Sequence, residues 1–419
     1  SALGIAQAQT DVTKEYLVNP SFETLKAADG ATDVTVKTKL ENGLYGWEIS
    51  RLGNNGNSTF QVESQESGSS SDFPGNGFIV PTEGTYYYFN SQTWMYGSNE
   101  SVIKTQTSKP LEAGNYYLTI DYKAADYSNN NTDGNGTSLG LKVHKAGSEE
   151  LLGENTAVRR AYSVINNNAS PNGDKYMQDA PWDKMGVMFT ITESSNIDIT
   201  IAQTLKSRGR SDVAYDNLKL YKMDEISESF PLDVSFLISN ANDYAFGGWK
   251  MEGGNTFQIN TWSTEGNTDG SNMTTPFIQD HVGKENKAAN AIISHTSNYL
   301  IPGIYEVSGL IRVLNEAGGA APSGATLYAN EGSTDACAGT SCTNGVYGTY
   351  TVKGTVGTDG VLTFGIKVAN ANFNWVSFKD FKLQYLGAAT TGQLKAILKE
   401  KMTEAQACVA NCSKGIAAS

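Results

Sequence analysis

The sequence predicts an all-β protein made of two antiparallel β-sandwich (jelly-roll) domains in tandem, followed by a C-terminal α-helix. Three observations lead to this fold class. Many short segments alternate apolar and polar residues, as half-buried strands do. The chain contains 43 glycines, which suit the turns between strands. A set of sequence anchors also occurs twice in the same order, which indicates two copies of one domain.

The repeat joins the first half of the chain to the second. The first copy opens with "YLVNPSFE" (16–23) and the second with "FLISNAND" (236–243). A Gly-Trp pair follows each opening, and we expect Trp47 and Trp249 to lie in the cores. Three further pairs of segments match in order: 58–64 with 255–261, 111–124 with 300–313, and 213–223 with 376–386. The repeat therefore predicts module 1 over 15–224 and module 2 over 232–387.

Residues 1–14 look like the end of a secretory signal peptide. An apolar stretch leads to Ala6-Gln7-Ala8, an A-x-A arrangement of the kind found at cleavage sites. A flexible, alanine-rich tail is the alternative interpretation. We therefore expect an exported protein that is secreted or held at the cell surface.

Residues 390–415 predict an amphipathic helix. Apolar residues occupy one helical face, at positions 394, 397, 398, 402, 405 and 409. Thr390 and Gln393 have the spacing of a capping box, and Gly415 is a suitable stop. A single helix cannot bury its own apolar face. We expect it to dock on the second sandwich, to begin a further helical region, or to pair with a partner.

The four cysteines form two close pairs. Cys337 and Cys342 enclose the short loop "CAGTSC", which predicts a local disulfide in an exported protein. Cys408 and Cys412 share a face of the predicted helix, and they are bridged, oxidised with a partner, or buried as thiols. With three dispersed histidines, the cysteines give no spacing typical of a zinc site.

Charge and hydropathy exclude two classes of partner. The formal net charge of −13 repels the phosphate backbone, so we expect no nucleic-acid binding. No apolar run reaches the length of about 18 residues that a membrane-spanning helix needs.

The repeated anchors resemble a known group of modules. "LVNPSFE", then "GW", then "YDNLKLY" are similar to the jelly-roll carbohydrate-binding modules of the family 4/9/22 type, within the galactose-binding-like fold. Paired copies are common in exported polysaccharide-degrading proteins of Bacteroidetes. The likeness covers 15–223 well, and over 232–387 it depends mainly on the internal repeat. It implies a polysaccharide or glycan as the binding partner.

The resemblance also implies a structural calcium ion between the first and last strands. It would make Glu23 and Asp216 ligands, since carboxylate oxygens suit Ca²⁺. The alternative is that both are ordinary solvated turn carboxylates. In module 2, Asp243 occupies the position of Glu23, but Asp380 falls opposite Asn217. That shift by one residue would turn the side chain to the other face, so the second site is doubtful.

Sugar binding requires flat aromatic surfaces with a polar rim. Trp94 and Tyr96 lie in "NSQTWMYGSNES", a polar setting typical of a loop, and are the first candidates. The alternative is that they pack beneath a long loop. Trp182, Trp262 and Trp375 are similar candidates.

No motif points to catalysis. The chain lacks a G-x-S-x-G elbow, an H-E-x-x-H helix and a P-loop. Its 44 acidic residues contain many pairs, but spacing along the chain does not place two carboxylates across a cleft. We expect a non-catalytic protein, with a glycoside hydrolase as the open alternative.

Two functions follow from these features. The first is a non-catalytic glycan-binding protein, or the binding part of a polysaccharide-degrading protein. The second is a cell-surface adhesin or a filament subunit, in which the sandwiches are building blocks and the terminal segments mediate self-assembly.

Overall fold

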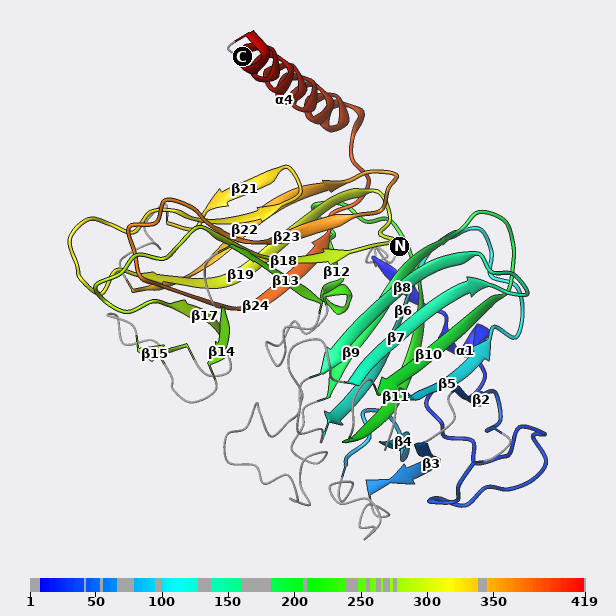
Figure 1. The fold of residues 1–419 in the computed structure, drawn as a ribbon. Coiled ribbons are helices and arrows are strands. Elements are labelled where there is room, and N and C mark those ends of the chain that lie inside the picture. Colours follow the sequence, from blue (N-terminus) through cyan, green and yellow to red (C-terminus); the bar gives the residue numbers. More distant parts are fainter. Residues whose placement is uncertain are drawn as a thin grey trace, which may run out of the picture.

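The computed structural model describes residues 8–40, 43–52, 56–65, 79–94, 99–126, 137–159, 182–205, 209–238, 248–253, 257–260, 265–266, 272–273, 277–337 and 345–417. Two antiparallel β-sandwiches lie side by side, and a long helix leaves the second one (Figure 1). The predicted fold class is therefore confirmed.

Module 1 consists of two sheets that face each other. The larger sheet has the order β3 (Gly56–Ser64), β4 (Tyr86–Trp94), β11 (Gly209–Met223), β6 (Gly114–Asp126), β9 (Asp183–Ile191), with β1 (Gln9–Asp11) also paired to β11. The smaller sheet has the order β2 (Glu48–Leu52), β5 (Asn99–Gln106), β10 (Ile197–Leu205), β7 (Thr137–Lys145), β8 (Leu151–Arg159). A short helix, α1 (Thr13–Tyr16), follows β1.

Module 2 repeats this plan. Its larger sheet has the order β14 (Gln258–Asn260), β17 (Phe277–His281), β24 (Trp375–Tyr385), β19 (Gly303–Leu314), β22 (Tyr347–Val356), with β12 (Leu232–Asp233) also paired to β24. Its smaller sheet has the order β13 (Trp249–Gly253), β18 (Ala291–Ser297), β23 (Leu362–Val368), β20 (Ala325–Ala329), β21 (Gly332–Asp335). A 3-10 helix, η2 (Ser235–Leu237), and a small hairpin of β15 (Glu265–Gly266) and β16 (Asn272–Met273) complete the module.

The last strand of each larger sheet carries the same bulge. The pairing of β11 with β6 shifts between Asp216 and Lys219, and the pairing of β24 with β19 shifts beside Lys379. Asn217 and Asp380 lie within these bulges, each with a φ of 55°. Asp380 is therefore the counterpart of Asn217, as the sequence comparison predicted, and the counterpart of Asp216 is Lys379.

The N-terminal segment departs from the predicted tail. Gln9–Asp11 pair with Tyr221–Met223 of β11. The register of β4 with β11 ends at Tyr215, before the bulge, so the remainder of that edge of β11 is open to β1. Residues 9–14 thus belong to module 1, because a distant strand offers them unpaired backbone groups.

The predicted core tryptophans are both buried. Trp47 is 3% exposed and stacks on Phe22 with ring centroids 5.0 Å apart. Trp249 is 8% exposed and contacts Phe364 edge-on at 5.7 Å. The glycine before each tryptophan has a positive φ, 81° and 86°, so the same turn delivers both rings to their cores.

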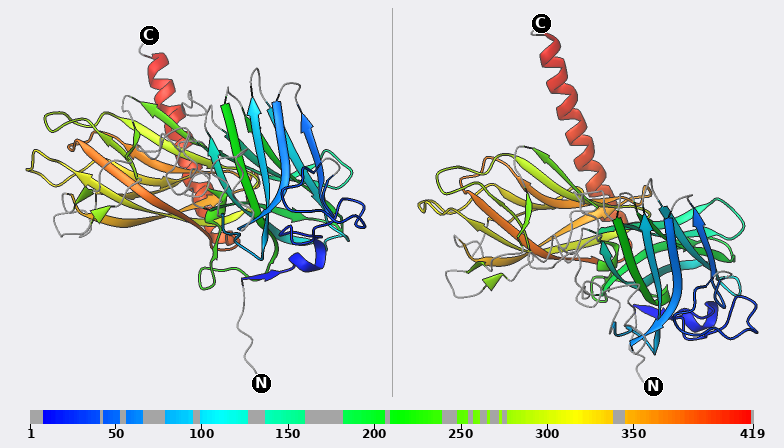
Figure 2. Two further views of the ribbon diagram at one scale, coloured as in Figure 1. Left: turned by 90° about the horizontal axis from the view of Figure 1, so that it is seen from below. Right: turned by 60° about the horizontal axis from the view of Figure 1, so that its bottom comes forward.

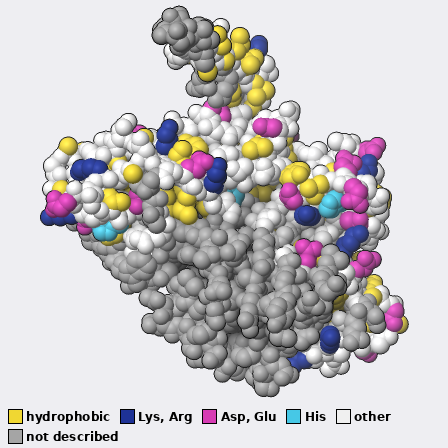
Figure 3. All heavy atoms as spheres, viewed as in Figure 1, with side chains coloured by type: hydrophobic (Ala, Val, Ile, Leu, Met, Phe, Trp, Pro, Cys, Tyr) yellow, Lys and Arg dark blue, Asp and Glu magenta, His cyan; other side chains and the backbone are white. Residues whose placement is uncertain are grey.

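The C-terminal helix α4 (Thr391–Ala417) begins as predicted and is not docked. The Thr390 N–H donates to Gln393 Oε1 at 2.7 Å, and the Gln393 N–H donates to Thr390 Oγ1 at 3.2 Å, which confirms the capping box. The helix projects away from both sandwiches (Figure 2) and continues past Gly415. Its apolar face is exposed (Figure 3): Leu394, Leu398, Met402 and Val409 are 48–66% accessible. Of the three alternatives that the sequence left open, docking on the second sandwich is therefore not observed, and the other two stay predictions.

None of the helices in the described ranges is both long enough and apolar enough to cross a bilayer.

Candidate functional site

The larger sheet of module 1 has a polar outer face. Successive side chains of a strand point to opposite sides of the sheet, and Tyr88, Ile120 and Val213 point into the core between the two sheets. The residues that alternate with them form what we call the polar face: Gln61, Glu63, Tyr87, Phe89, Ser91, Asp121, Lys123, Asp212 and Ala214. All of these side chains are buried, although they lie on the outer side of the sheet.

Hydrogen bonds fix the carboxylates of the polar face. Tyr87 Oη donates to Glu63 Oε2 at 2.9 Å, and Gln61 Nε2 also donates to Glu63. Burial raises the pKa of Glu63, although both hydrogen bonds favour its charged form. On the neighbouring strands, Ser91 Oγ donates to Asp212 Oδ1 at 2.6 Å. The carboxylates are therefore held in fixed orientations within the buried outer side of the sheet.

Trp182, predicted as a sugar-binding residue, lies at the edge of this face. Its Nε1–H donates to the carbonyl oxygen of Val80 at 2.9 Å, which fixes the indole. Tyr87 meets the ring edge-on at 6.5 Å, and Lys123 Nζ lies 5.9 Å from its centroid. Trp182 is only partly buried, so it is an accessible aromatic ring at the edge of the polar face.

Trp375 occupies the corresponding face of module 2. Its ring lies parallel to His281, with centroids 4.1 Å apart, and its Nε1–H donates to Gln279 Oε1 at 3.1 Å. Arg312 Cζ lies 5.2 Å from the Trp375 centroid and 5.5 Å from that of Tyr347. The four side chains are His281 of β17, Trp375 of β24, Arg312 of β19 and Tyr347 of β22. These strands are neighbours in this order, so the side chains form a row across the sheet.

The two modules place a cation beside an aromatic ring at equivalent positions. Gly114 is the first residue of β6 and Gly303 is the first residue of β19. Lys123 follows Gly114 by the same number of residues as Arg312 follows Gly303. Arg312 pairs with Tyr347, and in module 1 Lys123 and Trp182 come directly after the last pair of that register, Tyr122 with Asp183. Both cations are almost fully buried, 5% and 6% exposed, which is rare for such long charged side chains. The internal repeat thus includes the two faces as well as the cores.

A histidine and a carboxylate lie at the end of the row in module 2. His281 Nε2 is 2.9 Å from Glu316 Oε2, and Asn374 Nδ2 donates to the same oxygen at 2.6 Å. Partial burial raises the pKa of Glu316, but the hydrogen bonds from His281 and Asn374 outweigh it and lower the pKa overall. Glu316 therefore stays ionised beside the His281–Trp375 stack.

The remaining predicted aromatic residues are not placed on these faces. Trp94 is the last residue of β4 and pairs with Gly56 and Gly209, so its prediction as a loop residue is wrong. Tyr96 and Trp262 lie outside the described residues. Of the candidates that can be placed, Trp182 and Trp375 lie on different modules and do not form one site.

The predicted disulfide stays a prediction. Cys337 is partly buried, and its backbone N–H donates to Asp335 Oδ1 at 2.8 Å. Cys342 lies outside the described residues. Cys408 is exposed on α4.

Glu23 and Asp216, the predicted calcium ligands, hold opposite ends of one segment, residues 82–86. Glu23 Oε1 accepts the N–H groups of Thr85 and Tyr86, each at 2.9 Å. Asp216 Oδ2 accepts the N–H of Thr82 at 2.7 Å, its hydroxyl at 3.1 Å and the N–H of Glu83 at 2.9 Å. The structure therefore brings both carboxylates to the same segment.

Hydrogen bonds already satisfy these carboxylates without a cation, and the calcium site stays a prediction. Backbone N–H groups donate to Glu23 Oε1 and Asp216 Oδ2, whereas a Ca²⁺ site needs six to eight oxygen ligands. Among the described residues, no three His, Cys, Asp or Glu side chains cluster as a metal site. Asp243 lies outside the described residues. The geometry favours a clamp on the segment 82–86 over a metal site.

We expect chelation to leave the protein unchanged. Treatment with EGTA should not lower the thermal midpoint, because the hydrogen bonds at Glu23 and Asp216 need no cation. Asp216→Ala, in contrast, should lower the stability by about 1–3 kcal/mol, since it removes the buried acceptor of three part-buried hydrogen bonds from Thr82 and Glu83. Scanning calorimetry with elemental analysis checks both. A fall in the midpoint with EGTA that Ca²⁺ reverses would restore the calcium prediction.

Known proteins give a limited comparison. No family model and no curated protein matches the sequence. TmCBM61 in complex with β-1,4-galactotriose is 16% identical, covering 49% of this chain and 97% of that chain at a TM-score of 0.28. The tandem CBM22-1–CBM22-2 domain of Paenibacillus barcinonensis Xyn10C is 10% identical, with 91% and 99% covered and a TM-score of 0.24. A Stig cyclase, Fisc from Fischerella sp. TAU, is 14% identical, with 50% and 97% covered and a TM-score of 0.29.

The similar structures thus include carbohydrate-binding modules and a cyclase. At these low TM-scores, function has to be argued from the residues of this chain.

Proposed function

We propose that this chain is an exported, non-catalytic protein that binds glycan on the outer faces of its two larger sheets. The observation that carries the proposal is the repeated pair of a buried cation and a partly exposed ring, Lys123 with Trp182 and Arg312 with Tyr347. Two modules that keep this pair at one position have the means for two related binding surfaces.

The chemistry of these faces suits a hydroxylated ligand. A pyranose presents C–H groups that pack on an aromatic ring and hydroxyl groups that need fixed acceptors and donors. In module 1, Trp182 offers the ring, and the neighbouring Asp183 and Lys184 are the accessible polar groups. In module 2, His281 and Trp375 are both partly exposed, with Glu316 beside His281.

Site variants test this proposal. After a glycan array has identified a ligand, Trp182→Ala should weaken its binding at least tenfold, a loss of about 1.4 kcal/mol. Trp375→Ala tests module 2 in the same way. Phe230→Ala is the matched control, because Phe230 is 51% exposed and lies between the modules. Trp94→Ala completes the series, because Trp94 was also predicted to bind sugar and lies at the end of β4.

The outcomes are distinct. Binding that survives both Trp182→Ala and Trp375→Ala would exclude the outer faces. An array without any ligand would overturn the glycan proposal.

One observation favours the alternative of a self-assembling adhesin or filament subunit. Helix α4 carries exposed apolar residues, among them Leu398 at 61% and Val409 at 66%. Sedimentation of the intact chain over a range of concentrations distinguishes the two functions. A glycan binder of this design stays monomeric, whereas a subunit associates, and Leu398→Asp with Val409→Asp would then reverse the association.

A further inference from the structure

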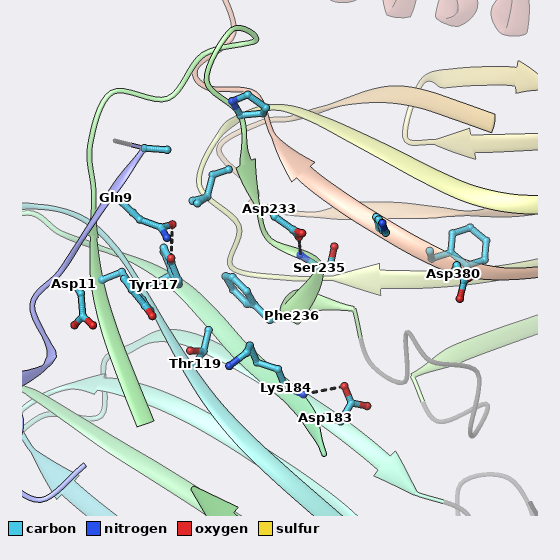
Figure 4. A pocket seen from close by; sticks show the side chains of 16 residues that line it. Gln9, Asp11, Tyr117, Thr119, Asp183, Lys184, Asp233, Ser235, Phe236 and Asp380 are labelled. Carbon is cyan, nitrogen blue, oxygen red and sulfur yellow. Dashed lines mark hydrogen bonds between the residues drawn. The ribbon is translucent and has the colours of Figure 1, made fainter. Parts of the chain in front are cut away.

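A cleft of about 1030 Å³ lies between the two modules (Figure 4). Strands β1, β6, β9 and β11 supply one wall. Residues 231–236 and the bulge of β24 supply the other. The cleft adjoins the outer face of module 1, since Asp183 and Lys184 line it, but none of Trp182, Trp375, Lys123 and Arg312 does.

A stack of three aromatic rings crosses the cleft. The Tyr221 and Tyr117 centroids are 4.6 Å apart, and the Tyr117 and Phe236 centroids are 5.0 Å apart, with the planes within 20° of parallel. Tyr117 is buried in the middle, while Tyr221 and Phe236 are partly exposed. Two ring faces of the stack are therefore turned away from its centre, and they come from different modules.

Packing between the modules fixes this cleft. Asn155 Nδ2 donates to the carbonyl oxygens of Gly186 at 2.9 Å and of Phe236 at 3.2 Å. A Cβ at Gly186 would lie 2.3 Å from the Phe236 ring, so only glycine admits this contact. Tyr305 Oη also lies 3.5 Å from Met188 Sδ across the interface. The cleft is preformed, so a ligand need not order it.

The rim of the cleft is acidic. Four aspartates and two lysines line it: Asp11, Asp183, Asp233, Asp380, Lys184 and Lys382. Lys184 already forms an ion pair with Asp121. None of the ion pairs within the described ranges engages Asp11 or Asp233, and each of these uses one oxygen to accept a local backbone N–H, from Thr13 and Ser235.

Asp11 and Asp233 approach the aromatic stack from opposite modules. Burial is the main cause that raises the pKa of Tyr117, with the neighbouring Tyr221 next. The charges of Asp11 and Asp233 raise it further. Two carboxylates that form no ion pair with any described residue thus lie beside rings whose π faces also attract cations.

We propose that this cleft binds a sugar chain that carries protonated amino groups. The outer faces of Tyr221 and Phe236 receive the pyranose rings, and Asp11 and Asp233 pair with the ammonium groups. An anionic chain would be repelled by the excess of carboxylates. A neutral chain would leave the carboxylates without a cation. The inference goes beyond the proposed function, because it concerns another site and another ligand charge.

Calorimetric titration of the intact chain tests this inference. The probes are a glucosamine hexasaccharide and the fully N-acetylated hexasaccharide, which has the same rings without the charge. We expect the glucosamine chain to bind at least tenfold more tightly, and added salt to weaken it. The double variant Asp11→Asn/Asp233→Asn should lose at least tenfold in affinity, since each asparagine keeps the local N–H acceptor but removes the charge.

Matched controls separate this site from the outer faces. Asp359→Asn removes an exposed charge in a turn that does not line the cleft, and it should leave binding unchanged. Trp182→Ala and Trp375→Ala report on the outer faces instead, so a loss of affinity confined to these variants would place the ligand there. Phe236→Ala should weaken binding, and its thermal midpoint shows whether the modules remain packed.

Three results would overturn the inference: equal affinity for the acetylated chain, full affinity in the Asp11→Asn/Asp233→Asn variant, or no binding of the glucosamine chain. Loss of binding in Trp182→Ala alone would assign the ligand to the outer face of module 1.

Discussion

Trp47→Ala and Trp249→Ala should each destabilise their own module by about 3–5 kcal/mol, the usual cost of removing a large buried aromatic side chain. Both indoles are almost completely buried, and each fills the centre of its sandwich. Trp47 also donates its Nε1–H to the carbonyl oxygen of Asn19 at 2.9 Å. We therefore expect the Trp47 variant to be at least as destabilised as the Trp249 variant.

Pulse-labelling hydrogen exchange along a urea series resolves the effect by module. In Trp47→Ala, the strands of module 1 should open at lower urea, with a smaller change in module 2. Trp249→Ala should show the reverse. Phe230→Ala, at an exposed position, is the control and should move neither transition. Equal shifts of both modules in each variant would mean that the two sandwiches unfold as one unit.

The fold was predictable because its signals are local and occur twice. A strand that buries one face must alternate, and a turn that needs a positive φ selects glycine, as at Gly46 and Gly248. The capping box at Thr390 and Gln393 is also a short-range pattern. Each of these features depends on residues a few positions apart, so the sequence contains them directly.

Two features of the fold depend on distant contacts, and their local sequence does not specify them. Gln9–Asp11 form a strand only because β11 has an open edge past its bulge, more than two hundred residues away. The apolar face of α4 has the pattern of a docked helix, but no pattern within the helix specifies what covers it. In both cases the deciding partner lies outside the segment.

The candidate site was predictable in part. Tryptophans in polar sequence surroundings were good indicators at Trp182 and Trp375, which lie on the outer faces. The same pattern was misleading at Trp94, because polar neighbours are typical both of a loop and of a strand whose side chains are hydrogen-bonded. Lys123 and Arg312 were missed, although the aligned segments 111–124 and 300–313 place them opposite each other. The signal that could have identified them is a cation at the same position in both copies of the repeat.

The cleft between the modules was not predictable. Tyr117, Tyr221 and Phe236 belong to a strand, a second strand and a short 3-10 helix, and only module packing brings them together. Neither half of the chain contains the complete stack.

Mild acid should weaken module 2 through one buried histidine. His295 is 2% exposed and lies between Trp249 and Phe364, each 5.3 Å away between ring centroids. Burial lowers the pKa of His295 to about 4, from an ordinary value of 6.5. Below pH 6.5, the unfolded chain therefore binds a proton that the native imidazole does not accept, so stability rises with pH in this range and is fully present above it. Lowering the pH from about 7.5 to about 5 should remove about 2 kcal/mol from module 2.

Module 1 should respond in the opposite direction. Burial raises the pKa of Asp216 to about 6, although its hydrogen bonds to the segment 82–86 oppose the shift. The native carboxyl therefore takes up a proton before the unfolded one does, and module 1 gains stability as the pH falls below about 6. Urea series at several pH values, labelled with a pulse at one fixed pH, separate the two trends. His295→Phe should abolish the acid loss of module 2 and leave the trend of module 1 unchanged, and an unchanged acid loss in this variant would assign it to other groups.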